Sequence, residues 1–117
     1  MYTIMISKEL MAASTRPLIL TILKRGKSYG YQIIQDVKQL SGGTLEWSDG
    51  MLYPVLHKLQ KDGCIQSNWV MSEEGRRRKY YSITEVGLEE LQTAKEQWLS
   101  IHEVFAKIWG PTPQWAT

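Results

Sequence analysis

The feature that most constrains the fold is the order of three helical patterns followed by two strand patterns. The third helical pattern is the clearest, because aliphatic side chains recur at the i, i+3, i+4 and i+7 spacing of an amphipathic helix: Leu52, Val55, Leu56 and Leu59. Ser48 can cap its first turn, and Gly63 can end it. Pro54 lies one turn inside and removes the backbone bond to the carbonyl of Gly50. The pattern therefore predicts a helix that tolerates a proline near its start.

A less regular helical pattern opens the chain. Four of its apolar residues recur at helical spacing, and Gly26 ends the run: Leu18, Ile19, Ile22 and Leu23. Pro17 disfavours a helical conformation at the residue before it. The sequence therefore predicts either a kink in a helix that begins near Ser7 or a new helix capped near Thr15.

The second helical pattern begins at Gly30, after Ser28 and Tyr29. Its apolar stripe predicts one buried face: Ile33, Ile34, Val37 and Leu40. The glycine pair after Ser41 ends it. Residues 44–47 then predict a short connector or one brief strand.

Two strand patterns follow the third helix. They cover residues 64–71 and 78–84, with a polar hairpin loop between them. Alternation along the strands predicts four core-facing side chains: Ile65, Trp69, Tyr81 and Ile83. Three helices and a β-hairpin are the elements of a winged helix-turn-helix, in which the third helix can enter the major groove of DNA while the hairpin lies along the backbone.

A long helical pattern over residues 85–109 follows the hairpin. Thr84 can cap it, and Gly110 can end it. Apolar side chains recur every seven residues and form a heptad seam: Leu91, Ala94, Trp98, Ile101, Phe105 and Ile108. A domain of 117 residues has little core left to cover this seam, so the seam predicts a homodimer. Two-fold symmetry would place the paired third helices ~34 Å apart, as a palindromic operator requires.

The expected architecture is mainly α with a small β-hairpin: a winged helix-turn-helix plus a long C-terminal dimerisation helix. Residues 1–84 form the expected DNA-binding domain, residues 85–109 the dimerisation helix and residues 110–117 a loose tail. The single cysteine, Cys64, excludes an internal disulfide and suits a reducing compartment. Because no apolar run near the start is long enough to cross a bilayer, a cytoplasmic protein without membrane partners is expected.

The charges are distributed unevenly along the chain. The net charge is only +2, but residues 1–84 carry twelve Lys/Arg against seven Asp/Glu, a local charge of +5. Residues 85–117 carry two against five, a local charge of −3. Four of the positive charges are consecutive, at residues 76–79. By itself this run is explained by a solvated loop, but a basic first part also suits a polyanionic partner.

The third helix carries a polar face opposite its aliphatic stripe. This face holds a small residue, a phenol, an imidazole and ammonium groups: Gly50, Tyr53, His57, Lys58 and Lys61. Such side chains can approach phosphates and reach base edges, although a plain solvated face would look the same. In a winged helix-turn-helix this face and the cationic hairpin lie on the same side. Together the two features favour DNA binding over a solvated loop and a solvated helix face.

The sequence resembles PadR-type transcriptional regulators over roughly residues 8–109. The resemblance is carried by YGYQI at 29–33, MLYPVLHKLQKDGCI at 51–65 and GRRRKYYSITEVG at 75–87. It implies that the LYP-containing helix is the recognition helix, the GR-rich hairpin is the wing and the C-terminal helix forms a homodimer. Asp49 departs from the family pattern, in which a proline often follows the serine, and it leaves the base contacts open.

The spacing and the resemblance together give one set of residues expected at DNA. These residues are Tyr29, Tyr31, Ser48, Gly50, Tyr53, His57, Lys58, Lys61, Arg76, Arg77, Arg78 and Lys79.

The short C-terminal region resembles the small-subunit branch of the family, some members of which are similar to multidrug sensors. The resemblance implies that Trp98 can line a site for a planar aromatic or cationic ligand at the dimer centre. The alternative is that Trp98 only packs the dimer core.

Other function classes have little support. His57 and His102 lie in different predicted helices, Cys64 begins a strand, and no P-loop, GxSxG or dinucleotide motif occurs. No Cys/His cluster has metal-ligand spacing, so neither a metal nor a cofactor is expected. The expected function is a sequence-specific regulator, most simply a repressor that a ligand releases. The remaining alternative is a winged-helix protein–protein adaptor that does not bind DNA.

Overall fold

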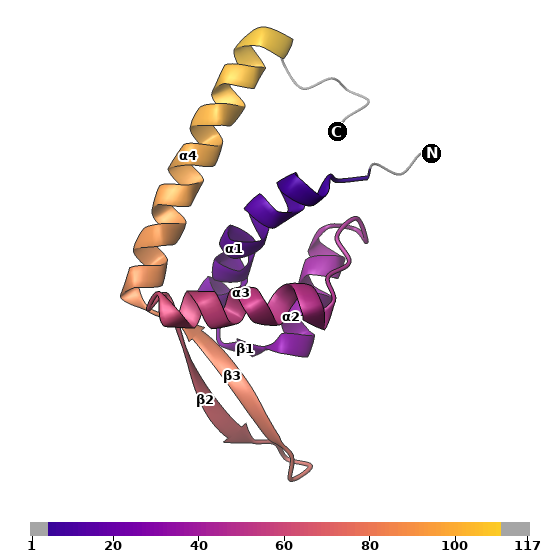
Figure 1. Cartoon of the computed structure of the whole chain (residues 1–117), viewed down its shortest axis with the longest axis vertical. Coiled ribbons are helices and arrows are strands. Elements are labelled where there is room, and N and C mark those ends of the chain that lie inside the picture. Colours follow the sequence, from indigo (N-terminus) through magenta and orange to yellow (C-terminus); the bar gives the residue numbers. More distant parts are fainter. Residues whose placement is uncertain (1–4, 111–117) are drawn as a thin grey trace.

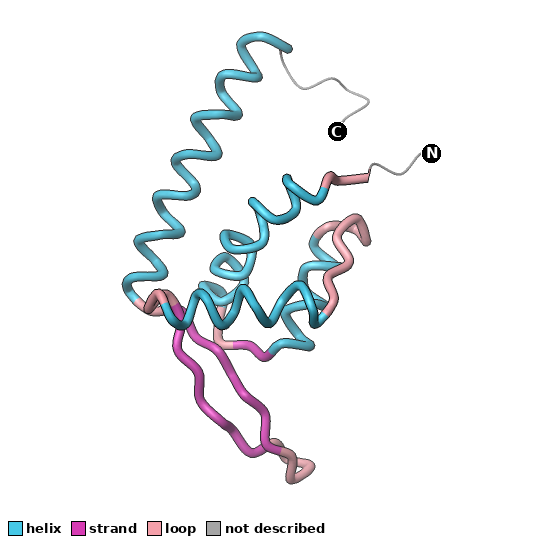
Figure 2. Tube along the Cα trace, viewed as in Figure 1, coloured by secondary structure: helices cyan, strands magenta, loops and turns pink. Residues whose placement is uncertain are grey.

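The structure, a computed structural model, describes residues 5–110. Within this range the chain forms a helical body, a small antiparallel sheet and one long C-terminal helix (Figures 1 and 2). The elements are α1 (Lys8–Arg25), β1 (Ser28–Tyr29), α2 (Gly30–Leu40), α3 (Asp49–Lys61), β2 (Ile65–Met71), β3 (Arg77–Ile83) and α4 (Glu85–Trp109). The predicted fold class is confirmed. The predicted loose tail lies, beyond Gly110, outside the described residues.

Helix α1 is one helix that runs through Pro17. Ser7 caps it by accepting a hydrogen bond from the amide of Leu10 at 3.2 Å. The new helix capped at Thr15 is therefore wrong, because Thr15 is a buried residue inside α1 and its hydroxyl donates to the carbonyl of Met11. A hydroxyl that bonds back to the preceding turn is compatible with a continuing helix.

The core lies where α1, α2 and α3 pack together and is closed by the base of the hairpin. Its fully buried aliphatic side chains come from all three helices: Ile19, Leu20, Ile33, Leu52, Leu56 and Leu59. Leu40, expected in the stripe of α2, is instead exposed, because it is the last residue of that helix and the chain turns away after it. Trp47 in the α2–α3 connector is buried in the same core.

The sheet has the order β1-β3-β2, and both pairs are antiparallel. Strand β1 was not expected from the sequence; its two residues pair with Tyr81 and Tyr80 of β3. The brief strand considered at residues 44–47 does not form, and that segment is irregular. Residues 28–29 form a strand because they pair with β3, which is distant along the chain. The local sequence around them therefore did not predict it.

The hairpin formed by β2 and β3, called the wing below, projects away from the helices (Figure 1). Its base is buried: Ile65 and Tyr81 lie in the core, and Ile83 packs against it. The prediction that Trp69 faces the core is wrong, because its side chain is 59 % exposed. Trp69 lies on the same face of β2 as Ile65, but at its position the strand extends beyond the helices that could cover it.

Helix α4 leads away from the base of the wing toward the opposite end of the molecule (Figure 1). Thr84 caps it by accepting a hydrogen bond from the amide of Gly87 at 3.2 Å, and Gly110, at φ 82°, ends it. Leu91 in the first half is buried in the protein's own core. None of the helices in the described part of the chain has the length and apolarity needed to cross a membrane.

Candidate nucleic-acid interface

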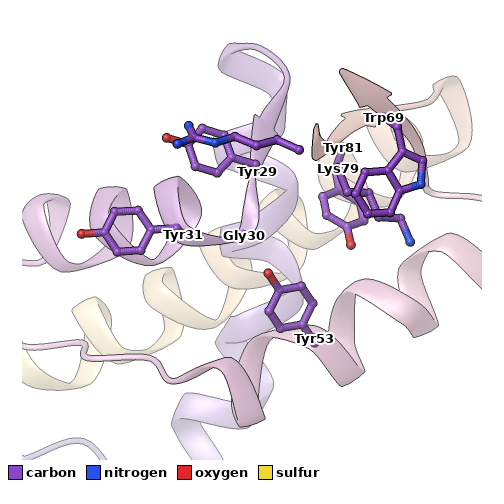
Figure 3. Close-up of a pocket in the computed structure, with 8 residues that line it drawn as sticks. Tyr29, Gly30, Tyr31, Tyr53, Trp69, Lys79 and Tyr81 are labelled. Carbon is purple, nitrogen blue, oxygen red and sulfur yellow. The ribbon is translucent and has the colours of Figure 1, made fainter. Parts of the chain in front are cut away.

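Residues from β1, α2, α3 and the wing surround one pocket of about 380 Å³ (Figure 3). It is lined by Tyr29, Gly30, Tyr31, Tyr53, Trp69, Arg78, Lys79 and Tyr81. Tyr53 is the contribution of α3, and Trp69, Arg78 and Lys79 come from the wing. The third helix and the wing therefore present side chains to the same side of the molecule, which is the arrangement that joint contact with a duplex requires.

A close approach between α3 and the start of α2 shapes this pocket. The phenol of Tyr53 points toward Gly30 (Figure 3), and a Cβ added at Gly30 would collide with its hydroxyl. Glycine is therefore required there to let the ring pass. Tyr81 lies deeper, and burial, followed by the proximity of Tyr53, raises the pKa of Tyr81. The phenol of Tyr81 is therefore a neutral hydrogen-bonding group at physiological pH.

The cations of the wing lie over aromatic rings. The guanidinium of Arg77 is 4.9 Å from the ring centre of Trp69, and that of Arg78 is 4.5 Å from the ring centre of Tyr29. The ammonium of Lys79 is 5.7 Å from the ring centre of Tyr81. These contacts orient the cations without neutralising them. The register of β3 places Arg77 and Lys79 on the face opposite Arg78.

The wing tip is a tight turn with acidic side chains at its end. Gly75, at φ 82°, donates to the carbonyl of Ser72, whose hydroxyl accepts from the amide of Arg76 at 3.0 Å. Glu73 and Glu74 in this turn are exposed. The positive surface of the wing therefore lies along the start of β3 rather than at the tip.

The predicted polar face of α3 is exposed throughout, at Gly50, Tyr53, His57, Lys58 and Lys61. Two of the expected DNA contacts have internal partners. The hydroxyl of Ser48 accepts from the amide of Met51 at 3.3 Å and caps α3. The ammonium of Lys58 lies 2.9 Å from Asp62. Lys61 and His57 are consequently more available to a ligand than Lys58.

Two residues around this surface were missed by sequence reasoning. Trp69 lines the pocket although a core position was expected for it. Lys27, just before β1, lies with its ammonium 5.8 Å from the ring centre of Tyr80 and adds a cation beside the wing. The only available signal for Lys27 was that it lies two residues before the tyrosine motif. Tyr31, which was predicted at the interface, lines the same pocket and is largely exposed.

The described residues contain no group of three His, Cys, Asp or Glu side chains that could hold a metal ion. The pocket offers aromatic faces, phenol groups and cations that form no ion pair with a carboxylate of the described residues, beside the exposed polar face of α3. This chemistry suits the backbone and groove edges of a nucleic acid. A three-helix body, a third helix with an exposed polar face and a cationic wing together define the class of winged-helix regulators.

The comparisons with known proteins identify the family. The model of the Transcriptional regulator PadR-like family matches residues 19–93. The chain therefore belongs to the PadR-like family of transcriptional regulators. It is 36 % identical over 88 residues to the Transcriptional regulator YqjI of Escherichia coli, covering 75 % of this chain and 41 % of YqjI.

Solved structures agree with this assignment. A transcriptional regulator from Clostridium thermocellum superimposes with a TM-score of 0.79 at 29 % identity, over 87 % of this chain and 96 % of that one. A PadR-like transcriptional regulator from Bacillus cereus gives a TM-score of 0.77 at 27 % identity, over 90 % and 100 % of the two chains. The family and these neighbours are transcriptional regulators, so the chain is not an enzyme.

Proposed function

We propose that this protein is a cytoplasmic repressor that binds a palindromic operator as a homodimer. Helix α3 enters the major groove, and the wing follows the adjacent backbone. Residues 1–84 are the DNA-binding domain, and residues 85–109 are the dimerisation helix. The single observation that carries the proposal is the common pocket of α3 and the wing, which Arg78 and Lys79 line together with Tyr53.

The dimer is supported by the apolar surface of α4. Four of the predicted seam side chains are substantially exposed in the single chain: Trp98 at 43 %, Ile101 at 53 %, Phe105 at 42 % and Ile108 at 72 %. A continuous apolar stripe of this kind is typical of an interaction surface. Ala94 is half-buried, whereas Leu91 is already buried in the protein's own core, so the proposed interface begins after Leu91.

The dimer proposal is tested by measuring mass and DNA binding on the same samples. In sedimentation experiments the wild type is expected to be a dimer, and Ile101→Glu, which places a charge in the seam, is expected to be a monomer. The monomer should lose most of its operator affinity because it holds only one recognition helix. Thr93→Glu, on an exposed position of the same helix outside the seam, is the matched control. A monomeric wild type that binds an operator with full affinity would refute the proposal.

The adaptor alternative is distinguished by ionic strength. DNA binding through the wing releases counterions, so affinity for the protein's own upstream DNA should fall steeply with salt. Tyr53→Ala and His57→Ala should change the preference among operators. An adaptor would show neither effect on a duplex.

We also propose an effector site beside Trp98. An open groove of about 430 Å³ lies between α1 and α4, with an apolar lining that includes Leu18, Leu45, Leu91 and Trp98, and with Lys95 at the same site. A planar aromatic molecule would stack on the indole. Titration with a planar cationic dye should quench tryptophan fluorescence in the wild type and not in Trp98→Ala. Equal quenching in both would leave Trp98 as a dimer-packing residue only.

A further inference from the structure

The end of the recognition helix and the start of the dimerisation helix meet at one corner of the molecule (Figure 1). The amide of Thr84 donates to the carbonyl of Cys64 at 3.0 Å, and the hydroxyl of Thr84 donates to the carbonyl of Gly63. Gly87 in α4 packs so closely that an added Cβ would collide with the carbonyl of Cys64. We call this contact, between residues 62–64 and residues 84–90, the α3–α4 joint.

Arg16 of α1 bridges the two sides of this joint. Its Nε and Nη2 atoms donate to the two carboxylate oxygens of Glu90 in α4, at 2.6 and 2.8 Å. Its Nη1 atom lies 2.9 Å from Asp62 at the end of α3. One guanidinium thus holds a carboxylate from each helix, and Nη2 also contacts the sulfur of Cys64 at 3.5 Å.

The geometry requires arginine at this position. The guanidinium is planar and has its donors in a fixed fork, so two carboxylates held by it are fixed in angle relative to each other. A lysine has a single ammonium group, so it cannot bind Glu90 through two nitrogens and reach Asp62 with a third. The carboxylates are ionised: the hydrogen bonds from Arg16 lower the pKa of Glu90, and Lys58 and then Arg16 lower the pKa of Asp62.

From this bridge we infer that Arg16 is a positioning residue, which fixes the angle between recognition helix and dimerisation helix and thereby the half-site spacing that the dimer accepts. The inference rests on the proposed function. In a dimer joined through α4, the location of each α3 relative to its own α4 determines the separation of the two recognition helices. If the joint were looser, each recognition helix could still contact its half-site, but the two recognition helices could adopt several distances from each other.

The inference is tested by selecting binding sites from random duplexes with the full-length wild type, which defines the preferred spacer. Affinities are then measured for this operator and for versions with the spacer one base pair longer or shorter. The wild type should prefer its own spacer by roughly tenfold, since one base pair both shifts and rotates a half-site. Arg16→Gln, Arg16→Lys and Glu90→Gln should reduce that preference to less than about threefold while remaining dimeric.

Glu89→Gln is the matched control, because it removes the same charge from an exposed neighbour outside the bridge. It should keep the wild-type preference. Folding is followed by thermal melting of each variant. A merely structural role would weaken binding to all spacers equally, and this result, or an unchanged preference in Arg16→Gln and Glu90→Gln, overturns the inference. If the wild type selects no paired half-sites at all, the proposed operator-binding function fails first, and the inference fails with it.

Discussion

The α3–α4 joint and the wing both depend on arginine, but they use its charge in opposite ways. At the joint, the single Arg16 is 27 % exposed and is held by two carboxylates. In the wing, Arg77 and Arg78 lie over aromatic rings, and in the described part of the chain residues 76–79 form no ion pair with a carboxylate. The charge of Arg16 is thus neutralised within the protein, whereas the charges of the wing are available to a partner.

This difference separates stability from binding. A bidentate pair fixes the relative position of two helices, so its loss changes the folded protein. A cation over a ring keeps its charge and most of its donors, so its loss changes mainly what the protein attracts. Replacing the wing cations at residues 76–79 is therefore expected to change the stability of the fold very little, whereas replacing Arg16 should lower it.

The largest effect is expected from the wing. Arg77→Ala combined with Arg78→Ala should lower operator affinity roughly 100-fold at low salt and flatten the salt dependence by about 2 units, because two phosphate contacts are lost. Thermal stability should hardly change. Fluorescence anisotropy over a series of salt concentrations measures both quantities. Lys107→Ala, in the last turn of α4 at the end of the molecule away from the wing, is the control and should bind normally (Figure 1). Equal losses in the two variants would contradict a specific role for the wing.

A smaller effect, and on stability alone, is expected from glycine substitutions in the two regions. Gly87→Ala forces a side chain against the carbonyl of Cys64 and should cost about 2 kcal/mol of unfolding free energy. Gly75→Ala meets no atom within 4 Å but adopts φ 82°, so strain alone should cost about 1 kcal/mol. Chemical denaturation of both variants gives the comparison. If Gly75→Ala were the more harmful, the close packing assigned to the joint would be wrong.

The smallest effect is expected at Arg16. Because the pair with Glu90 is about one-third exposed, Arg16→Gln should cost only about 1 kcal/mol at neutral pH. The pKa values of Glu90 and Asp62 are lowered in the folded protein, so this stabilisation is present above the ordinary carboxyl range and is lost as pH falls through the lowered values.

The pH series therefore gives a second measurement of the same bridge. The stability difference between wild type and Arg16→Gln should narrow from about pH 7 to about pH 3. The wing double variant should follow the wild-type curve over this range. A constant difference for Arg16→Gln would show that its effect does not come from the two carboxylates.

Local patterns predicted most elements of the fold. The aliphatic spacing of α3, its cap at Ser48 and the cap of α4 at Thr84 are all present in the structure. These features depend on contacts within a few residues, which a sequence displays directly. The cations of the wing were also predictable, because residues 76–79 follow the polar loop of the hairpin directly in the sequence.

The errors share one physical cause. Trp69 has the alternation of a core residue, but whether a strand position is covered depends on how far the helices extend over it. Strand β1 exists only because residues 28–29 meet β3, more than fifty positions later.

The sequence by itself determined the order of the elements, their caps and the concentration of positive charge in residues 76–79. Only the tertiary structure decided which charges remain available. It brought Asp62 and Glu90 to Arg16 across three helices and left the wing cations on aromatic rings. The reason is that a charge is neutralised by groups near it in space, and most of those groups are distant along the chain.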